Sequence, residues 1–445
     1  MKILYIVPYA PTPIRTRPYN LLIGLLGQGH QVTLATVWEN ETEKSILADF
    51  TKKGMHVLAA HLSRPRIAKN LVTALIFGHP LQANYSWQPE VARQVDALCN
   101  FTPNSHQLSP NFDIIHIEHL RGAIYGLRIR SKQPQGSTPP GWPNLRAAAG
   151  LSTTIPIVWD SVDNISALFE QAARRGASRF GRWVTQFEIP RTRRFEASLL
   201  DQFQQTLVTS PVDKRAFEKL LEEEKHCSNS QHSLPIEVLT NGVDLITFRP
   251  AETSYQRDLV IFSGKLSYHA NISAALYLVK QVMPIVWERR PHTRVLLAGK
   301  DPHSILQGLS KEDHRIELTG TVPDLPSYIQ RAAVAVATIT YGAGVQNKVL
   351  EAMACATPVV ATSKAISALQ AQPEHEILVA DDPNGLAAQI LRLLEDEQLR
   401  QSIAQNGLDY VRRNHKWNPI ATQLVTIYEK VVHNSIVNSA SKFSQ

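Results

Sequence analysis

Short apolar runs alternate with amphipathic stretches along the chain. The first apolar run covers residues 3–7, a helical pattern follows over about residues 19–28, and a second apolar run covers residues 31–37. This alternation is typical of parallel sheets covered by helices. The other strands predicted in the first half lie at residues 56–60, 113–117, 155–159, 205–209 and 236–239. Together these elements predict one complete doubly wound α/β domain.

The same pattern starts again after residue 250. Further strands are predicted at residues 259–263, 294–298, 316–319, 334–338, 358–361 and 377–379. The chain is therefore predicted to contain two doubly wound, Rossmann-like α/β domains that face each other across a cleft. Such sheets bind ligands outside the carboxyl ends of their strands, so we expect ligands in this cleft.

Turn residues and prolines mark the predicted domain limits. Residues 241–250 begin with Asn-Gly-Val-Asp and end in proline, which is typical of a linker. We expect a first domain at residues 1–245 and a second domain at residues 246–416. A helix at residues 417–435 is expected to pack on the first domain, with a frayed tail at 436–445. Two stretches without periodicity, residues 131–152 and 221–235, are interpreted as insertions.

Composition narrows the class of protein. Of the 445 residues, 43% are hydrophobic and 19% are charged, which excludes a disordered chain. Three scattered cysteines (Cys99, Cys227 and Cys355) form no disulfide framework and favour a reducing compartment. The first apolar run is too short for a signal peptide, and the best apolar window, residues 71–78, is far shorter than the ~18–20 residues that span a membrane. We expect a cytoplasmic protein, either soluble or bound at the inner face of the cytoplasmic membrane.

The positive charge lies mainly in the first half. The net charge is +7, and residues 1–250 account for +6 of it. The densest part is residues 171–200, where seven arginines and two glutamates are interleaved with Phe180, Trp183 and Phe187. This stretch predicts a basic amphipathic helix that lies on anionic lipid or holds an anionic acceptor, the alternative being a solvated helix face with its aromatic rings turned inward. No nucleic-acid-binding motif accompanies the charge, so no nucleic-acid partner is expected.

The most informative motif follows the predicted strand at residues 334–338. Gly342 and Gly344 stand in a turn before a helix that carries Lys348 and Glu351 three positions apart, hence on one face. Glycines let the backbone approach a ligand closely, and the start of a helix favours an anion such as a diphosphate. Lysine can meet the phosphate charge while glutamate accepts hydrogen bonds from ribose hydroxyls. The motif therefore predicts a nucleotide-sugar site, although an ordinary surface pair after a loop is the alternative.

Two further segments reach the same predicted sheet edge. Ser263-Gly264-Lys265 closes the first strand of the second domain, and Asn271 begins the helix after it. The turn that contains Val322 follows another strand and offers backbone groups to the edge of a base. In the first domain, Arg15 and Arg17 lie in the loop after the first strand, as candidates to grip an acceptor or a phosphate.

Taken together, these motifs resemble glycosyltransferase family 4. The resemblance rests on Gly-Ala-Gly and Asn-Lys-x-Leu-Glu-Ala-Met-Ala at residues 342–354 and on Asn-Gly-Val-Asp to Phe-Arg-Pro at residues 241–250. The details look like a bacterial branch associated with exopolysaccharides. The resemblance implies the two-domain GT-B fold and a hexosyltransferase that moves a sugar from a nucleotide-sugar to a glycan or lipid-linked acceptor with retention of configuration, in polysaccharide or glycolipid biosynthesis.

The resemblance also implies an acceptor-side role for residues 1–245, a nucleotide-sugar-binding role for residues 246–416, and roles for individual residues. Catalytic roles fall to His119, Lys265 and Lys348, with His119 displaced by one residue from the usual histidine. Donor binding is expected from Gly264, Val322, Gly342, Gly344, Val345, Asn347 and Glu351. The acceptor-side candidates are Arg15, Arg17, Glu118 and Asp163, together with Asp160; Asp163 alternatively caps the next helix.

Two departures from the family pattern leave alternatives open. The family usually carries a glutamate eight positions before Glu351, where this chain has Ala343, and a lysine where it has Ala270. A catalytically silent relative that binds a partner and a sugar-nucleotide epimerase of the same fold are the other readings. The sequence contains no Asp-x-Asp triplet that could hold a metal ion, so we expect no cofactor and no metal.

Overall fold

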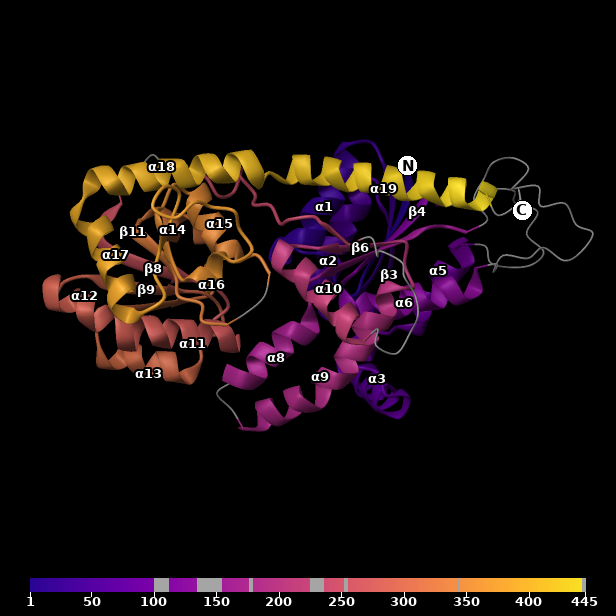
Figure 1. The fold of residues 1–445 in the computed structure, drawn as a ribbon, viewed down its shortest axis with the longest axis horizontal. Coiled ribbons are helices and arrows are strands. Elements are labelled where there is room, and N and C mark those ends of the chain that lie inside the picture. Colours follow the sequence, from indigo (N-terminus) through magenta and orange to yellow (C-terminus); the bar gives the residue numbers. More distant parts are fainter. Residues whose placement is uncertain are drawn as a thin grey trace, which may run out of the picture. The chain divides into compact units, whose positions relative to one another are not determined.

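A computed structural model describes residues 1–99, 112–133, 154–175, 179–224, 236–251, 255–341 and 344–441, with the side chains of 174–175, 179–182 and 438–441 left aside. The chain divides into two compact units (Figure 1). Unit 1 comprises residues 1–169, 186–239 and 418–445, and unit 2 comprises residues 170–185 and 240–417. The domain limits predicted from the sequence stay predictions.

Unit 1 is built on a seven-stranded parallel sheet in the order β3-β2-β1-β4-β5-β6-β7. The strands are β1 (Lys2–Val7), β2 (Gln31–Trp38), β3 (His56–His61), β4 (Ile114–Glu118), β5 (Ile157–Val162), β6 (Gln205–Val208) and β7 (Ile236–Val238). The helices that follow them are α1 (Thr16–Gly27), α2 (Glu41–Lys52), α3 (Arg64–Phe77), α4 (Leu81–Tyr85), α5 (Pro89–Cys99), α6 (His119–Lys132), α8 (Ile165–Arg175), α9 (Arg179–Leu200), α10 (Pro211–Glu224) and α19 (Trp417–Ser441).

Unit 2 repeats this architecture with a six-stranded parallel sheet in the order β10-β9-β8-β11-β12-β13. Its strands are β8 (Gln256–Ser263), β9 (Arg294–Ala298), β10 (Ile316–Gly320), β11 (Ala332–Ala337), β12 (Val359–Ala361) and β13 (Leu378–Val379). Its helices are α11 (His269–Tyr277), the π-turn η2 (Leu278–Val282), α12 (Met283–Arg289), α13 (Ser304–Glu312), α14 (Leu325–Gln330), α15 (Asn347–Ala354), α16 (Ser363–Ile366), α17 (Pro383–Glu395) and α18 (Glu397–Asn414).

The central strands are apolar because helices cover both faces of each sheet. All six residues of β11 are buried, and in β1 only Lys2 is exposed. Parallel strands buried on both sides read as continuous apolar runs rather than alternating ones. The prediction of two doubly wound α/β units is therefore confirmed, and every predicted strand overlaps an observed one.

Three local predictions need correction. Helix α1 begins at Thr16, so Arg17 belongs to its first turn and not to a loop. Strand β5 continues to Val162 and takes in Asp160, which the sequence placed after the strand. Helix α19 runs on to Ser441, beyond the predicted fraying point. Of the predicted insertions, residues 131–132 and 221–224 end helices α6 and α10, and residues 134–152 and 225–235 lie outside the described residues.

Each sheet reverses its strand order once, next to its first strand. In unit 1 the reversal lies between β1 and β4, and in unit 2 between β8 and β11. Doubly wound sheets bind ligands at this point, outside the carboxyl ends of the strands. The topology thus directs attention to the segments after β1 and β4 and to those after β8 and β11.

Within the described part of the chain, no helix combines the length and the apolar character needed to cross a membrane.

We expect Gly126→Ala to lower the melting temperature, because helix α6 packs at this glycine against the sheet. An added Cβ would lie 2.2 Å from Ile117 Cδ1 and 2.9 Å from a ring carbon of Phe203. Overpacking of this kind costs about 1–3 kcal/mol. The matched control is Gly27→Ala at the end of α1, where nothing lies within 4 Å of the added Cβ. Equal melting temperatures for Gly126→Ala and the control would contradict this packing.

Candidate functional site

Two glycines bring backbone segments together at the carboxyl edge of unit 2. Gly264, directly after β8, has a φ of 144°, and Gly299, directly after β9, has a φ of 159°. A Cβ on Gly299 would lie 1.7 Å from the carbonyl oxygen of Gly264, and one on Gly264 would lie 2.9 Å from Asn271 Nδ2. Gly299 requires glycine because a Cβ would collide with the Gly264 backbone, and Gly264 favours glycine because side chains disfavour its φ.

Lys348 in the first turn of α15 points to the same place. Its Nζ donates a hydrogen bond to Asn271 Oδ1 at 2.7 Å and lies 4.2 Å from the ring centroid of Phe262. Asn271 in turn donates through Nδ2 to the carbonyl oxygen of Lys265 at 3.0 Å. A Cβ on Gly264 would be 3.1 Å from Lys348 Nζ. The structure therefore brings Gly264, the Lys265 backbone and Lys348 together, as the sequence predicted for a diphosphate site.

The electrostatics of Lys348 and Glu351 are unusual for surface helices. Burial lowers the pKa of Lys348 to about 7, although Glu351 opposes the shift. Burial also raises the pKa of Glu351 to about 7, and Lys348 opposes that shift in turn. Groups removed from water without a close counter-charge titrate near neutral pH, and such groups gather at functional sites.

Most of the other predicted donor residues are described by the structure, and they follow β8, β10 and β11. Gly344 has a φ of 70°, and Val345 packs against the core of unit 2. Asn347 is the first residue of α15, and the Lys265 side chain is exposed. Val322 is half-buried in the turn after β10, the edge strand of the sheet. Gly342 and Ala343 lie outside the described residues.

Unit 1 buries a carboxylate at the end of β4. Glu118 is fully buried, and it accepts hydrogen bonds from Tyr5 Oη at 3.2 Å and Tyr9 Oη at 2.8 Å. Burial raises the pKa of Glu118 to about 8, and Asp160 adds to the shift while Arg17 opposes it. The predicted acceptor-side carboxylate is thus held by tyrosines and protonates near neutral pH.

His119, the next residue, has strained backbone. Its φ is 64°, and Val162 at the end of the neighbouring strand β5 has a φ of 68°. Positive φ is uncommon for histidine and an outlier for a β-branched residue, and such strain clusters at functional sites. Burial lowers the pKa of His119 to about 3, so its imidazole is neutral at physiological pH. Its position at the strand reversal agrees with the sequence, and its catalytic role stays a prediction.

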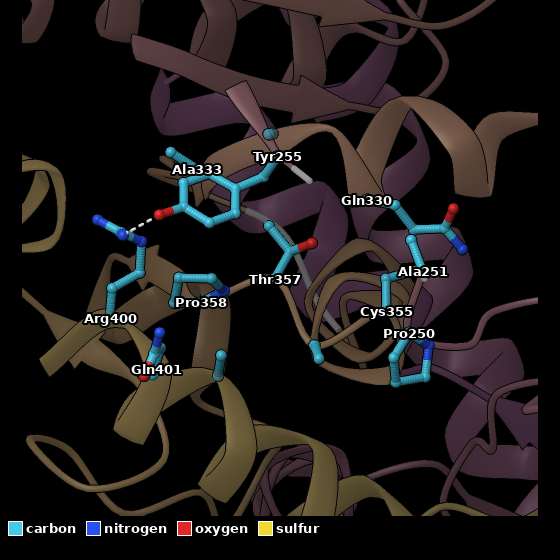
Figure 2. A pocket seen from close by; sticks show the side chains of 13 residues that line it. Pro250, Ala251, Tyr255, Gln330, Ala333, Cys355, Thr357, Pro358, Arg400 and Gln401 are labelled. Atoms are coloured by element: carbon cyan, nitrogen blue, oxygen red, sulfur yellow. Dashed lines mark hydrogen bonds between the residues drawn. The ribbon is translucent and has the colours of Figure 1, made fainter. Parts of the chain in front are cut away.

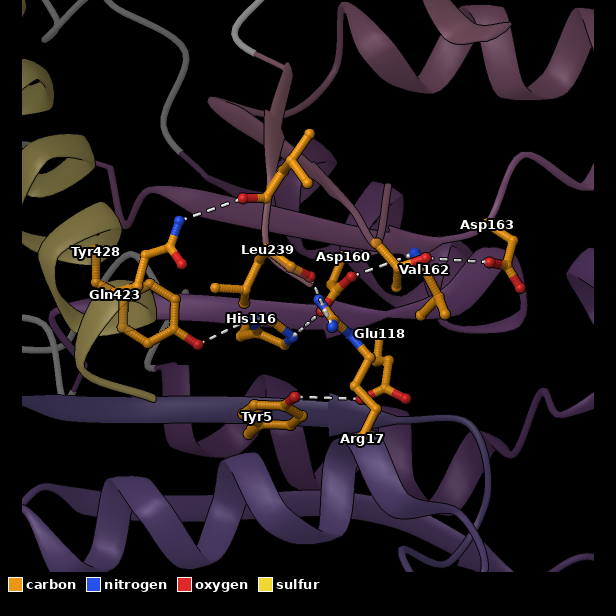
Figure 3. A network of polar contacts seen from close by, with 12 residues as sticks. Tyr5, Arg17, His116, Glu118, Asp160, Val162, Asp163, Leu239, Gln423 and Tyr428 are labelled. Atoms are coloured by element: carbon orange, nitrogen blue, oxygen red, sulfur yellow. Dashed lines mark hydrogen bonds and ion pairs between the residues drawn. The ribbon is translucent and has the colours of Figure 1, made fainter. Parts of the chain in front are cut away.

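Arg17 forms a buried ion pair rather than an exposed grip. Its Nη2 lies 2.7 Å from Asp160 Oδ2, Nε donates to the same oxygen at 2.8 Å, and Nη1 donates to the carbonyl oxygen of Leu239 at 2.9 Å. Burial alone would lower the pKa of Arg17, but the Asp160 carboxylate raises it. His116 stacks on Tyr5 and pairs with Tyr428 Oη of α19 at 2.8 Å (Figure 3).

The remaining acceptor-side candidates differ in exposure. Arg15 is partly exposed, pairs with Glu43 at 3.0 Å and stacks over the ring of Tyr9. Asp163 accepts a hydrogen bond from Thr209 Oγ1 at 3.3 Å, and burial, aided by Asp213, raises its pKa to about 7. The cap of α8 belongs to Asn164, whose Oδ1 accepts from Ala167 N at 2.8 Å, so the alternative capping role of Asp163 is wrong.

The predicted basic helix, residues 171–200, corresponds to the end of α8 and the whole of α9. The side chains of Arg174, Arg175, Arg179, Phe180 and Arg182 lie outside the described residues. Two aromatic residues further along α9 are described: Trp183 is 63% exposed, and Phe187 is 37% exposed with Arg191 stacked 3.6 Å from its ring centroid. These two rings are not turned inward.

A pocket of about 170 Å³ lies at the opposite, amino-terminal edge of the unit 2 sheet (Figure 2). It is lined by residues at the starts of β8, β11 and β12, such as Tyr255, Ala332 and Pro358. The guanidinium group of Arg400, which lines the pocket, donates to the Tyr255 hydroxyl. It also donates to the carbonyl oxygen of Leu393 at 2.9 Å. Because this edge faces away from the carboxyl ends of the strands, the pocket is separate from the Lys348 site.

Sequence reasoning missed the groups that surround the candidates. Tyr5, Tyr9 and Tyr428 supply hydrogen bonds to Glu118 and His116, and Gly299 permits the close approach to Gly264. One signal in the sequence could have indicated a buried polar network: His116 is a polar residue inside the otherwise apolar strand β4. Among the described residues, no group of three His, Cys, Asp or Glu side chains could hold a metal ion.

Comparison with known proteins points to glycosyltransferases. Residues 257–396 match the family model described as "Glycosyl transferases group 1". Over 202 residues the chain is 28% identical to the phosphatidyl-myo-inositol mannosyltransferase of Mycolicibacterium smegmatis, covering 43% of this chain and 51% of that protein. It is 27% identical over 229 residues to the D-inositol 3-phosphate glycosyltransferase of Salinispora arenicola, covering 44% and 50%. The chain spans about half the length of these curated relatives.

Solved structures share the fold over nearly the whole chain. Sucrose-phosphate synthase of Thermosynechococcus elongatus superposes with a TM-score of 0.66 at 16% identity, covering 98% of this chain and 100% of that one. The Anabaena protein HepE, in complex with UDP-glucose, superposes with a TM-score of 0.60 at 14% identity, covering 97% and 100%. The fold is therefore that of two-domain GT-B glycosyltransferases, and residues 257–396 carry the group 1 sequence pattern.

We expect Arg17→Met to destabilise the protein strongly, because it leaves the Asp160 carboxylate buried without its counter-charge. Breaking a buried pair costs about 3–5 kcal/mol. The double variant Arg17→Met/Asp160→Asn should recover a large part of this loss. Arg15→Met, which breaks a partly exposed pair, should cost at most about 1 kcal/mol. Chemical denaturation measures all three; a mild Arg17→Met effect would return Arg17 to an acceptor-binding role.

Proposed function

We propose that this protein is a glycosyltransferase that moves a hexosyl group from a nucleotide-sugar to a glycan or lipid-linked acceptor, with retention of anomeric configuration. The observation that carries the proposal is the position of Lys348, which lies between Asn271 and the Gly264 turn at the strand reversal of unit 2. The family match over residues 257–396 covers this site. The UDP-glucose complex of HepE, which shares the fold, supports a nucleotide-sugar as donor.

Lys348 is suited to a diphosphate because its ammonium group donates to a neutral amide oxygen, that of Asn271, while Glu351 acts on it only through its charge. A donor phosphate would provide that counter-charge. The amino end of α15 adds the positive end of the helix dipole. Glu351, one turn later, would accept hydrogen bonds from the ribose hydroxyls. Gly264 leaves room for the phosphates to approach the backbone, and the turn at Val322 would meet the base.

The transfer breaks the bond between the sugar's anomeric carbon and the phosphate oxygen, and it forms a bond from that carbon to an acceptor oxygen. In a retaining transfer without an enzymic nucleophile, the departing phosphate oxygen takes the acceptor proton on the same face. Lys348 and Lys265 would stabilise the developing charge on the diphosphate, which makes a metal unnecessary in this proposal. His119, at the strand reversal of unit 1, would contact the acceptor, and the fully buried Glu118 would act on it through the tyrosines that hold it.

The other features of the proposal follow the charge distribution. We propose a cytoplasmic site of action in polysaccharide or glycolipid biosynthesis, with contact to the inner face of an anionic membrane. Ala343 leaves open how the transferred sugar's hydroxyls are held; the backbone amides of Gly344 and Val345 are the proposed replacement. The comparisons favour neither the epimerase nor the silent-scaffold reading.

Glu351→Ala should weaken nucleotide-sugar binding by roughly 10- to 100-fold at pH 8, since a charge-assisted hydrogen bond contributes about 1.5–3 kcal/mol. Calorimetry with a panel of nucleotide-sugars identifies the donor and measures the change. Glu312→Ala on the exposed face of α13 is the matched control, because its side chain is solvated. Equal affinities for wild type and Glu351→Ala would remove Glu351 from the donor site.

Donor affinity should also fall as the pH rises above 7. The free protein holds the pKa of Lys348 at about 7, and a bound diphosphate would raise it, so binding takes up a proton above pH 7. The association constant then decreases by up to about tenfold per pH unit, until the pH reaches the pKa of Lys348 in the complex. Lys348→Met should flatten this slope and lower turnover, whereas Lys311→Met on α13 should not. Glu351 also has a pKa of about 7 and would bind ribose better when ionised, so the slope is measured in Glu351→Gln, where only Lys348 titrates. A pH-independent affinity in that variant would contradict the placement of the diphosphate at Lys348.

A further inference from the structure

Helix α3 presents a continuous apolar stripe on its outer face. Val72 is 55% exposed, Leu75 47%, Ile76 73% and Phe77 69%. Successive residues on a helix are about 100° apart, so Ala68, Val72, Leu75 and Ile76 share one face. Phe77 lies about 100° further round than Ile76, at the exposed end of the helix. Single exposed apolar side chains are ordinary, but a contiguous patch marks an interaction site.

The opposite face of α3 is fixed to unit 1. Ala74 is fully buried, and Asn70 is 3% exposed and donates through Nδ2 to the carbonyl oxygens of Tyr85 at 3.1 Å and Trp87 at 2.8 Å. Gly78, with a φ of 68°, ends the helix in the left-handed conformation. The inner face is therefore satisfied by the protein itself, which leaves the stripe directed outward from a rigid support.

The charge around the stripe has one sign. Residues 62–89 contain Arg64, Arg66 and Lys69 and no Asp or Glu. Arg64 and Lys69 are exposed, and Lys69 lies beside the stripe. A positive field without carboxylates complements an anionic surface, and each such residue near a charged bilayer strengthens binding.

The neighbouring part of α9 has the same character. It is joined to the segment after α3 by the hydrogen bond from Leu81 N to Glu188 Oε2, 2.7 Å long, and by the His79 and Phe195 rings, whose centroids are 5.4 Å apart. There the half-exposed Phe187 carries the stacked guanidinium of Arg191. Aromatic rings next to arginine are typical of surfaces that meet the headgroup region of a bilayer.

We propose that α3 is a membrane-contact helix, in which the stripe Ala68, Val72, Leu75 and Ile76, with Phe77 at the helix end, enters the boundary between headgroups and acyl chains of an anionic bilayer. Arg64 and Lys69 would meet the lipid phosphates. Interfacial helices lie in the membrane plane in this manner, with one apolar and one basic face. The inference rests on the membrane contact in the proposed function and assigns a surface to it. Lipid binding is measured without donor or acceptor, so its failure is distinguishable from failure of the proposed transfer reaction.

The test is co-sedimentation of the whole protein with vesicles of phosphatidylcholine alone or mixed with phosphatidylglycerol, at low and high salt. The wild type should prefer the anionic vesicles and keep part of its binding at high salt, because apolar insertion is not screened. Ile76→Ser/Phe77→Ser should lower the partition coefficient at least about tenfold, since affinity scales with the apolar area that is buried. Lys69→Gln should lower only the salt-sensitive part.

Matched controls separate this surface from general apolarity and charge. Ile246→Ser removes an isoleucine that is 85% exposed in unit 2, and Lys311→Gln removes an exposed lysine on α13; both should bind vesicles as the wild type does. Unchanged melting temperatures keep the comparison valid. Wild-type binding by Ile76→Ser/Phe77→Ser, or no binding by the wild type, would overturn the proposal. So would a wild-type dimer that the double variant converts to a monomer without loss of lipid binding, since the stripe would then cover a second copy of the chain.

Discussion

Burial of charge at the carboxyl edges of two parallel sheets is the constraint on which both candidate sites depend. Each sheet reverses its strand order between its first strand and a later one, and there the covering helices diverge. In unit 1 the edge holds the fully buried Glu118 and the buried Arg17–Asp160 pair, and in unit 2 it holds the half-buried Lys348 and Glu351. Removing these groups from water shifts their pKa values. The hydrogen-bond partners and counter-charges that replace water determine which of them are available to a ligand.

Apolar periodicity was enough to predict the fold, because strands buried on both faces leave unbroken β-branched runs. Turns with glycine and helix faces three residues apart predicted the grouping of Gly264 and Lys348. The environment of Arg17 could not be predicted in this way, since its partner Asp160 is 143 positions away in the sequence. The position of the Asp160 side chain also depends on where strand β5 ends. Pairing across a sheet is a property of tertiary structure, whereas a motif in one loop and helix is local.

The apolar window at residues 71–78 illustrates a second limit of sequence reasoning. Its length excludes a membrane span, and the same residues would suit a buried helix equally well. Only the positions of Asn70 and Ala74 on the inner face show that Val72 and Ile76 turn outward. The surface that we propose for lipid contact therefore depends on the orientation of α3. The hydrogen bonds of Asn70 define this orientation, whereas the number of apolar residues in the window does not.

The two edges differ in how their cations are neutralised. Arg17 has a carboxylate at 2.7 Å and a backbone carbonyl at 2.9 Å, so its charge is compensated within the protein and a ligand would have to displace Asp160. Lys348 has an amide oxygen at 2.7 Å and a carboxylate that acts only from a distance, so it loses its proton near neutral pH. A phosphate entering beside Gly264 would take the place in unit 2 that Asp160 occupies in unit 1. An uncompensated cation at a strand reversal, next to glycines that leave room for a ligand, is thus the physical reason to place the donor in unit 2.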